Sequence, residues 1–169
     1  MAHDPAIETV GRVRIASLAD RLDAIDTIAQ WHWEVWGDED PIGPATAWAA
    51  RLRERANRMA IPATYIAITE DGELVGTASL IAEDLASRHD LSPWLAGVYV
   101  IPAWRGRGVG SALTRHAVAE AAAMGTRRLY LHTEHARALY ERLGWRAIAT
   151  DHRQGHDLVV MTIETGAGS

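Results

Sequence analysis

The feature that most constrains the fold of this chain is a glycine-rich loop between a predicted strand and a predicted helix. An apolar run at 95–100 predicts the strand, and a proline turn leads from it into Arg-Gly-Arg-Gly-Val-Gly at 105–110. An alanine-rich helix is predicted from Val109 onwards. Unpaired N–H groups at a helix start, glycines that permit close approach to the main chain, and two arginines can together hold a pyrophosphate. The loop therefore predicts an anion site.

Two familiar phosphate-binding loops do not fit this segment. The Walker loop requires Gly-Lys followed by Ser or Thr, and the chain contains no lysine. The dinucleotide-binding loop requires G-x-G-x-x-G within an early βαβ unit, whereas the glycines at 106, 108 and 110 alternate strictly. The predicted anion site is therefore of another type.

Length and composition predict a single domain. A chain of 169 residues can bury roughly two thirds of its unfolded surface, and 48% hydrophobic with 23% charged residues is typical of a globular protein. We expect a loose leader at 1–11, one domain at 12–165 and a tail at 166–169. No apolar run approaches the ~20 residues of a membrane span, and the N-terminus lacks a signal-peptide pattern. A cytoplasmic protein without a membrane partner is expected.

Cysteine content and charge exclude several kinds of chemistry. The absence of cysteine excludes a thiol nucleophile, a disulfide framework and thiolate metal sites. A net charge of −5 disfavours extended nucleic-acid binding. His132 and His135 stand three residues apart, but no HExxH motif or carboxylate cluster accompanies them, so no metal is expected.

Hydrophobic periodicity predicts a mixed α/β layout in the order β-α-α-β-β-β-α-β-α-β-β. Asp71-Gly72 predicts a hairpin turn between strands at 65–69 and 74–80. A capping pattern at Ser17 predicts a helix from that residue. The expected inner face of this helix recurs at helical spacing and comprises Leu18, Leu22, Ile25, Ala29, Trp33 and Trp36. A second helix from about Thr46 is expected to bury one stripe, namely Trp48, Leu52, Ala56 and Met59.

Two segments together resemble a known family. The Arg-x-x-Gly-x-Gly pattern at 105–110 resembles the coenzyme A pyrophosphate loop of the GCN5-related N-acetyltransferase (GNAT) family. Leu-Tyr-Glu-Arg-Leu-Gly-Trp at 139–145 resembles the family's Leu-Tyr-x-x-x-Gly-Phe signature, with Trp145 replacing phenylalanine. The clear resemblance runs from about Trp94 to Ala149. It implies an α/β fold with a single, mixed, mostly antiparallel sheet of about seven strands and helices on both faces.

The resemblance implies a function and a donor site. It implies an N-acetyltransferase that moves the acetyl group of acetyl-CoA to a primary amine of a small molecule or peptide, by direct attack in a ternary complex. The strand before the loop would pair with the pantetheine arm, and the loop would hold the pyrophosphate. The residues expected to bind the donor are Val98, Tyr99, Val100, Arg105, Gly106, Arg107, Gly108, Val109, Gly110 and Ser111. Thr133 stands where family members often carry asparagine, and it is included as a further contact.

The resemblance suggests Tyr140 as the general acid. An unperturbed tyrosine has a pKa of ~10 against ~8.5 for a thiol, so it stays protonated and can hydrogen-bond to the departing thiolate. The alternative is a packed tyrosine whose hydroxyl is satisfied by the backbone.

The general base is left open. Many relatives carry a glutamate on the strand before the loop, but residues 94–100 contain no acid. The candidates are His132, Glu134, His135 and the acids at 38–40, beside a water chain or an amine delivered neutral. Each side chain has a structural alternative: a half-buried strand histidine, a charge at a helix start, or a solvated turn.

The acceptor is predicted only by class. Trp31 beside Asp38, Glu39 and Asp40 would form an aromatic and acidic pocket that attracts a cationic amine. Two other functions stay open: a non-catalytic acetyl-CoA sensor, and a toxin that acetylates aminoacyl-tRNA, although the acidic pI of about 5.9 disfavours the latter. Both a monomer and a homodimer fit the sequence.

Overall fold

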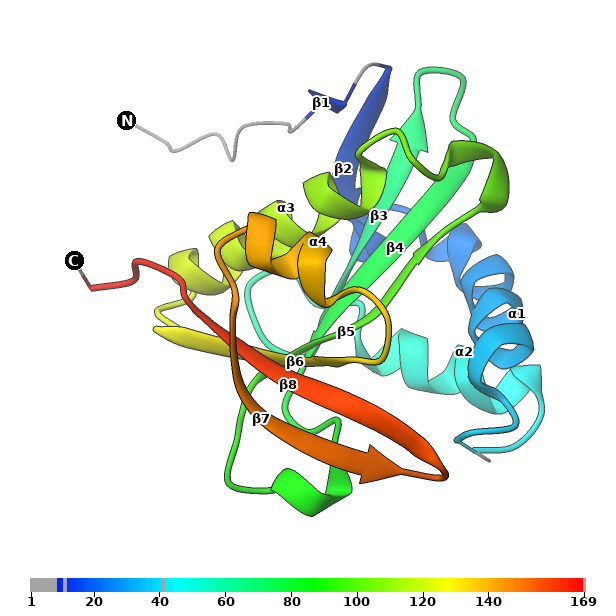
Figure 1. The fold of residues 1–169 in the computed structure, drawn as a ribbon. Coiled ribbons are helices and arrows are strands. Elements are labelled where there is room, and N and C mark those ends of the chain that lie inside the picture. The colour runs from blue at the N-terminus through cyan, green and yellow to red at the C-terminus, as the bar shows by residue number, and fades with distance from the viewer. Residues whose placement is uncertain (1–8, 11, 41, 169) are drawn as a thin grey trace.

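One sheet connects the whole molecule, with its strands in the order β1-β2-β3-β4-β5-β6-β8-β7 (Figure 1). The computed structural model describes residues 9–10, 12–40 and 42–168. Neighbouring strands are antiparallel except for β5 and β6, which run parallel. Apart from the two-residue β1, the sheet has seven longer strands, and this mixed, mostly antiparallel arrangement confirms the predicted fold class.

The order of the longer elements is the predicted one. The strands are β1 (Thr9–Val10), β2 (Val13–Ser17), β3 (Ala63–Thr69), β4 (Leu74–Ile81), β5 (Trp94–Val100), β6 (Arg128–Thr133), β7 (Arg146–Arg153) and β8 (His156–Glu164). The α-helices are α1 (Ile25–Trp36), α2 (Ala45–Glu54), α3 (Val109–Ala123) and α4 (Arg137–Arg142). β1 falls within the expected leader, whose first eight residues and Gly11 lie outside the described part of the chain.

The helices cover both faces of the sheet, as Figure 1 shows. Successive residues of β3 point to opposite faces. Ile66 and Ile68 join the cluster beneath α1 and α2, whereas Tyr65 and Ala67 join the larger cluster beneath α3 and α4. β3 is consequently buried along its whole length, which explains its mostly apolar sequence. Within the described ranges, no helix is long and apolar enough to cross a membrane.

The first helix begins later than predicted. Ser17 does act as a cap, since its Oγ accepts a hydrogen bond from the Ala19 N–H at 3.1 Å, but it caps only a short 3-10 turn. The chain leaves helical geometry at Arg21 (φ −140°, ψ 62°), and α1 starts at Ile25. The expected continuous inner stripe was therefore wrong.

The break at Arg21 changes which side chains of this region are buried. Leu22 and Trp33 are 58% and 43% exposed, whereas Ile28 and His32 are almost completely buried. His32 follows Ile25 and Ile28 at helical spacing, so it lies on the buried face of α1. The imidazole of His32 thus lies in the core, whereas the sequence pattern predicts the neighbouring Trp33 on the buried face.

The second helix ends earlier than predicted. The Asn57 side chain donates hydrogen bonds to the carbonyls of Glu54 and Pro62, at 2.9 and 2.7 Å, and thereby closes α2 at Glu54. Trp48 and Leu52 are buried as expected, but Met59 lies beyond the helix and is 66% exposed.

Candidate active site

The neighbouring strands β5 and β6 diverge along the sheet, and the gap between them forms the candidate site. The parallel pairing of β5 with β6 is confined to Trp94 opposite Tyr130, where the Tyr130 N–H donates to the Pro93 carbonyl at 3.1 Å. Beyond this point β5 stays paired with β4, and β6 with β8. The facing edges therefore offer backbone groups that can pair with an extended ligand.

A bulge interrupts β5 within the separated segment. Where β4 advances by two residues, from Ser79 to Thr77, β5 advances by three, so one extra residue is accommodated at 97–98. Gly97 adopts φ +62°, and a Cβ there would lie 3.3 Å from His32 Cε1. Glycine is thus required both by the backbone conformation and by the close approach of His32.

His32 lies between the bulge and two aromatic rings. Its ring centroid is 5.1 Å from that of Trp36 and 6.1 Å from that of Trp48. Burial, followed by the charge of Arg55, lowers the pKa of His32 to about 4, so the imidazole is neutral at pH 7. Proximity to the Gly97 backbone opposes this fall in the pKa to a smaller extent, but no hydrogen bond of good geometry reaches the buried Nε2 atom from the described residues.

The glycine loop joins the far end of β5 to α3. Gly106 and Gly108 adopt left-handed conformations, with φ +72° and +85°. A Cβ at Gly106 would meet no atom within 4 Å, so the space beside it is open. No side chain caps the start of α3 at Val109, and the first N–H groups of this long helix face the loop without a side-chain acceptor.

Two arginines flank this loop. Arg105 donates from Nε to the Val100 carbonyl at 2.9 Å, and its guanidinium lies 5.6 Å from the centre of the Tyr99 ring. The Arg107 guanidinium lies 4.8 Å from the centre of the Trp104 ring. Both cations belong to the loop that leads into α3, where they would strengthen anion binding.

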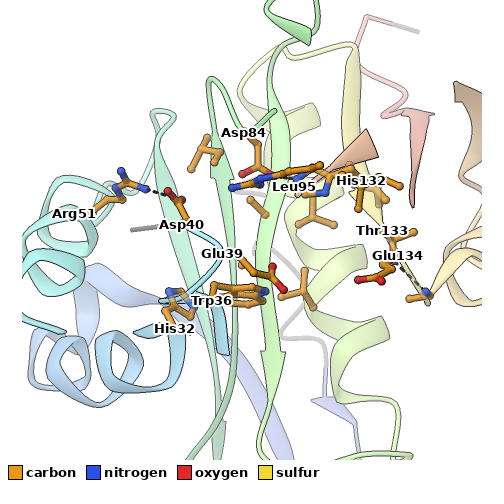
Figure 2. A pocket seen from close by; sticks show the side chains of 18 of the residues that line it. His32, Trp36, Glu39, Asp40, Arg51, Asp84, Leu95, His132, Thr133 and Glu134 are labelled. Atoms are coloured by element: carbon orange, nitrogen blue, oxygen red, sulfur yellow. Dashed lines mark hydrogen bonds and ion pairs between the residues drawn. The ribbon is translucent and has the colours of Figure 1, made fainter. Parts of the chain in front are cut away.

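A cavity of about 340 Å³ opens where β5 and β6 separate (Figure 2). On one side its wall is formed by α1, α2 and the loop that follows α1. On the other side it is formed by residues of β6, β7, β8 and α4. The groups that can carry charge are His32, Glu39, Asp40, Arg51, Arg55, Asp84, His132, Glu134, Tyr140 and Arg153.

Tyr140 brings a phenol into this cavity from α4. The residue is 8% exposed, and its ring packs edge-on against Trp145 at 6.1 Å. Its hydroxyl forms no hydrogen bond with any residue that the structure describes, so the backbone-satisfied alternative does not apply. Burial raises the pKa of Tyr140 to about 12, and the hydroxyl remains a donor at every physiological pH.

His132 projects from the end of β6 into the same cavity. Its Nε2 lies 2.9 Å from Asp84 Oδ2, although the geometry is not that of a hydrogen bond. The ring packs edge-on against Trp94 at 6.0 Å. A histidine beside a carboxylate, on a rigid strand, is the arrangement of an oriented proton acceptor.

Glu134 and Thr133 already have partners. Glu134 Oε1 lies 2.7 Å from His156 Nδ1, and this carboxylate raises the pKa of His156. Thr133 Oγ1 accepts a hydrogen bond from the Ala136 N–H at 3.0 Å, which orders the turn that leads into α4. Glu134 is consequently less available than His132 as a proton acceptor.

Comparison with known proteins shows to which family this architecture belongs. The acetyltransferase (GNAT) family model matches residues 25–145, which is more than half of the chain. The chain belongs to the GNAT family. The two motifs at 105–110 and 139–145 both lie within the matched range, and the separated central strands lie between its ends.

Two curated relatives of this GNAT domain resemble about half of its chain. One is mycothiol acetyltransferase of Nocardia farcinica, 38% identical over 86 residues, which cover 50% of this chain and 26% of that protein. The other is the uncharacterized N-acetyltransferase YjgM of Escherichia coli, 38% identical over 88 residues, which cover 50% of this chain and 52% of that protein. The matches thus span about a quarter and about half of the relatives' lengths.

Solved structures agree on the fold. An aminoglycoside 6'-N-acetyltransferase complexed with coenzyme A matches with a TM-score of 0.71 at 19% identity, covering 89% of this chain and 96% of that one. A GNAT superfamily phosphinothricin acetyltransferase from Sinorhizobium meliloti in complex with AcCoA also gives 0.71, at 20% identity, covering 94% and 91%. At these identities the likeness shows the GNAT fold alone.

The GNAT cavity gathers most of the side chains proposed from sequence for chemistry. Tyr140, His132 and Glu134 line it together with Thr133 and Val98. Of the acids proposed for the acceptor, Glu39 and Asp40 also line it.

Three other proposed residues lie apart. Asp38 and Trp31 do not line the cavity, and the Trp31 ring instead packs 5.2 Å from that of Tyr99. His135 has a side chain that is 85% exposed, and it too lies outside the lining.

The cavity also contains residues that sequence reasoning missed, namely His32, Trp48, Arg51, Arg55, Asp84 and Arg153. The sequence pattern predicts Trp48 only as a core residue, and the others come from a helix face, a loop and a strand end without a motif. The one available signal was the spacing of Trp48, Arg51 and Arg55, which places three polar-tipped side chains along one face of a helix. Among the described residues, no group of three or more potential ligands could hold a metal ion.

Proposed function

We propose that this GNAT domain transfers the acetyl group of acetyl-CoA directly to a primary amine of a small molecule or peptide. The observation that carries the proposal is the position of the Tyr140 hydroxyl, which has no partner within the described ranges and lines the cavity between the separated β5 and β6. The relatives named above for acetylating aminoglycosides and phosphinothricin support an amine acceptor.

The donor fits the residues at the end of β5. The open space beside Gly106 and the uncapped start of α3 suit a pyrophosphate, with Arg105 and Arg107 beside it. The edge of β5 at 98–100 is not paired with β6, although Arg105 already donates to its Val100 carbonyl. This edge suits the pantetheine arm, which can pair with it like an added strand. Acetyl-CoA bound in this way would deliver the acetyl group into the cavity.

The chemistry requires one proton acceptor and one donor. The amine nitrogen attacks the carbonyl carbon, the carbon–sulfur bond breaks, and the sulfur leaves with the bonding electron pair. His132 accepts the proton that the amine loses, with Asp84 holding its ring, while the backbone at the β5 bulge donates to the developing oxyanion. Glu134, which His156 engages, is the second choice of base.

Tyr140 acts on the departing sulfur mainly through a hydrogen bond. With its pKa raised to about 12, it is a weaker acid than a thiol at ~8.5, so complete proton transfer to the thiolate is unfavourable by several powers of ten. A donated hydrogen bond still stabilises the negative charge as it forms.

An acceptor panel tests the proposal. Purified protein is incubated with acetyl-CoA and individual amines, and thiol release is followed. We expect turnover with at least one primary amine. Tight coenzyme A binding without turnover across the panel would favour the sensor function, and salt-dependent binding of tRNA would favour the toxin. Absence of coenzyme A binding would overturn the proposal altogether.

A further inference from the structure

One face of α2 lines the acceptor side of the cavity. Trp48 and Arg51 of α2, and Arg55, the C-cap residue directly after it, are spaced by three and four residues, which places them along one side of the helix, and all three belong to the cavity wall. Arg53 lies between them in sequence but points away, with a side chain that is 61% exposed and 3.7 Å from Asp26. The helix thus turns two guanidinium groups and one indole toward the ligand space.

Arg55 has no partner for its charge. Its backbone N–H donates to the Leu52 carbonyl at 3.0 Å, but its guanidinium forms no hydrogen bond, and no ion pair within 4 Å, with any residue that the structure describes. Burial, followed by repulsion from Arg51, lowers its pKa to about 10, while Asp84 and Asp40 attract it from beyond ion-pair distance. The group still carries its proton at pH 7, so a half-buried cation stands without a counter-ion within ion-pair distance among the described residues.

Trp48 adds an unsatisfied donor on the same face. Its Nε1 is buried without a hydrogen-bond partner, and an indole N–H can only donate. His32 Nε2, which belongs to a residue of the same cavity wall, is also buried without a hydrogen-bond partner among the described residues. Buried polar groups normally have partners, so such a concentration points to groups that a ligand completes.

The remaining charges of the cavity are largely paired. Asp40 lies 3.7 Å from Arg51, Asp84 lies 2.9 Å from His132, and Glu134 lies 2.7 Å from His156. Outside these pairs stand two cations, Arg55 and Arg153, and one anion, Glu39, none of which has an ion pair within 4 Å among the described residues. A ligand that pairs with both kinds of unpaired charge carries an anionic group for the arginines and a cationic group for Glu39.

We propose that Arg55, with the Trp48 indole N–H, binds a carboxylate of the acceptor, so that the acceptor is a small amino acid-like molecule. The carboxylate lies against α2, and the amine is directed toward Val98 and Tyr140 across the cavity, with Glu39 as the uncommitted anion beside it. This inference rests on the proposed function, since it names the class of amine that the acetyltransferase uses.

The test compares amino acids with their own carboxamides. Alpha-, beta- and gamma-amino acids, each paired with its amide, are titrated into the protein saturated with coenzyme A, and binding is measured by calorimetry. At least one acid is expected to bind about 30-fold more tightly than its amide, because the amide lacks the charge that Arg55 would hold. The same pairs are then assayed for thiol release with acetyl-CoA.

Three variants locate the effect. Arg55→Gln is expected to weaken binding of the acid about 30-fold and to leave binding of the amide unchanged. Trp48→Phe keeps a ring at this position and is expected to weaken binding of the acid about 5-fold. Arg53→Gln removes a charge from the same helix outside the cavity, and it is expected to bind both ligands as the parent does.

The outcomes separate this inference from the proposed function. Acids and amides that bind and react equally well would overturn the carboxylate site while leaving an N-acetyltransferase. An acid that binds through Arg55 without being acetylated would support the anion site and count against catalysis. Failure of every acid to bind more tightly than its amide, or an equal loss in Arg53→Gln, would overturn the inference.

Discussion

The donor half and the acceptor half of the candidate site are built in different ways. The donor half consists of one continuous segment, in which β5, the glycine loop and α3 follow each other directly, and it presents mostly backbone N–H groups. The acceptor half collects side chains from α1, α2, the loop after β4 and the end of β7. The donor half would hold its ligand through backbone N–H groups, and the acceptor half through charged side chains that come from separate elements.

This difference explains why one half is tied to a family motif and the other is not. Glycines at positive φ and an uncapped helix start can be satisfied only by a few residue types in a fixed order, so the donor loop leaves a sequence signature. A charge in the acceptor half can come from any element that reaches the cavity. The acceptor half can therefore change its ligand while the donor half stays the same.

Removing the Tyr140 hydroxyl is expected to have the largest effect, because this group acts where the two halves meet. Tyr140→Phe should lower kcat at least about 100-fold, since it removes the donor to the departing sulfur, while coenzyme A affinity stays the same. Steady-state kinetics at saturating acetyl-CoA would measure this. Tyr130→Phe, which removes a hydroxyl outside the cavity, serves as the matched control. An unchanged kcat in Tyr140→Phe, with chemistry rate-limiting, would remove Tyr140 from the mechanism.

A smaller effect is expected at Asp84, which acts through His132. Asp84→Asn should lower kcat about 10-fold and leave the KM for acetyl-CoA unchanged, because the carboxylate only orients the imidazole. Asp84→Glu should recover part of the loss. Asp90→Asn, in the same loop and paired with Arg88 at 2.9 Å, should behave like the parent. Equal losses in Asp84→Asn and Asp90→Asn would indicate a general effect on the loop.

The smallest expected effect concerns the stability of the acceptor half toward acid. Because the pKa of His32 lies near 4 in the folded chain, the unfolded chain binds its proton first as the pH falls. The stability due to neutral His32 is complete above its ordinary pKa and is lost on the way down to about pH 4. Between about pH 6.5 and about pH 5.5, the parent should lose about 1 kcal/mol more than His32→Leu does. Urea unfolding at both pH values measures this difference, and parallel losses would show that His32 does not titrate as described.

Features that depend on local sequence could be predicted, whereas features that depend on distant contacts could not. The hairpin at Asp71-Gly72 and the order of the longer elements were correct because each depends on local turn chemistry or periodicity. Ile25 and Ala29 are buried as predicted, but Leu22 and Trp33 are exposed. The predicted helix start was wrong because the conformation breaks at Arg21, and nothing in the local pattern marks that break.

The acceptor residues escaped prediction for a different reason. Asp84 and Arg55 are ordinary surface-type residues in sequence, and only the separation of β5 from β6 gives them a shared cavity. Their role depends on contacts between residues distant in sequence, which periodicity and motifs do not encode.

Coenzyme A titration of two matched glycine variants tests the central claim, that the loop after β5 is the donor site. Gly106 and Gly125 have φ of +72° and +84°, and a Cβ at either position meets no atom within 4 Å, so alanine strains both equally, by about 1 kcal/mol. We predict one-to-one binding in the parent, binding at least about 10-fold weaker in Gly106→Ala, and parent-like binding in Gly125→Ala. Equal affinities in the two variants would contradict the claim.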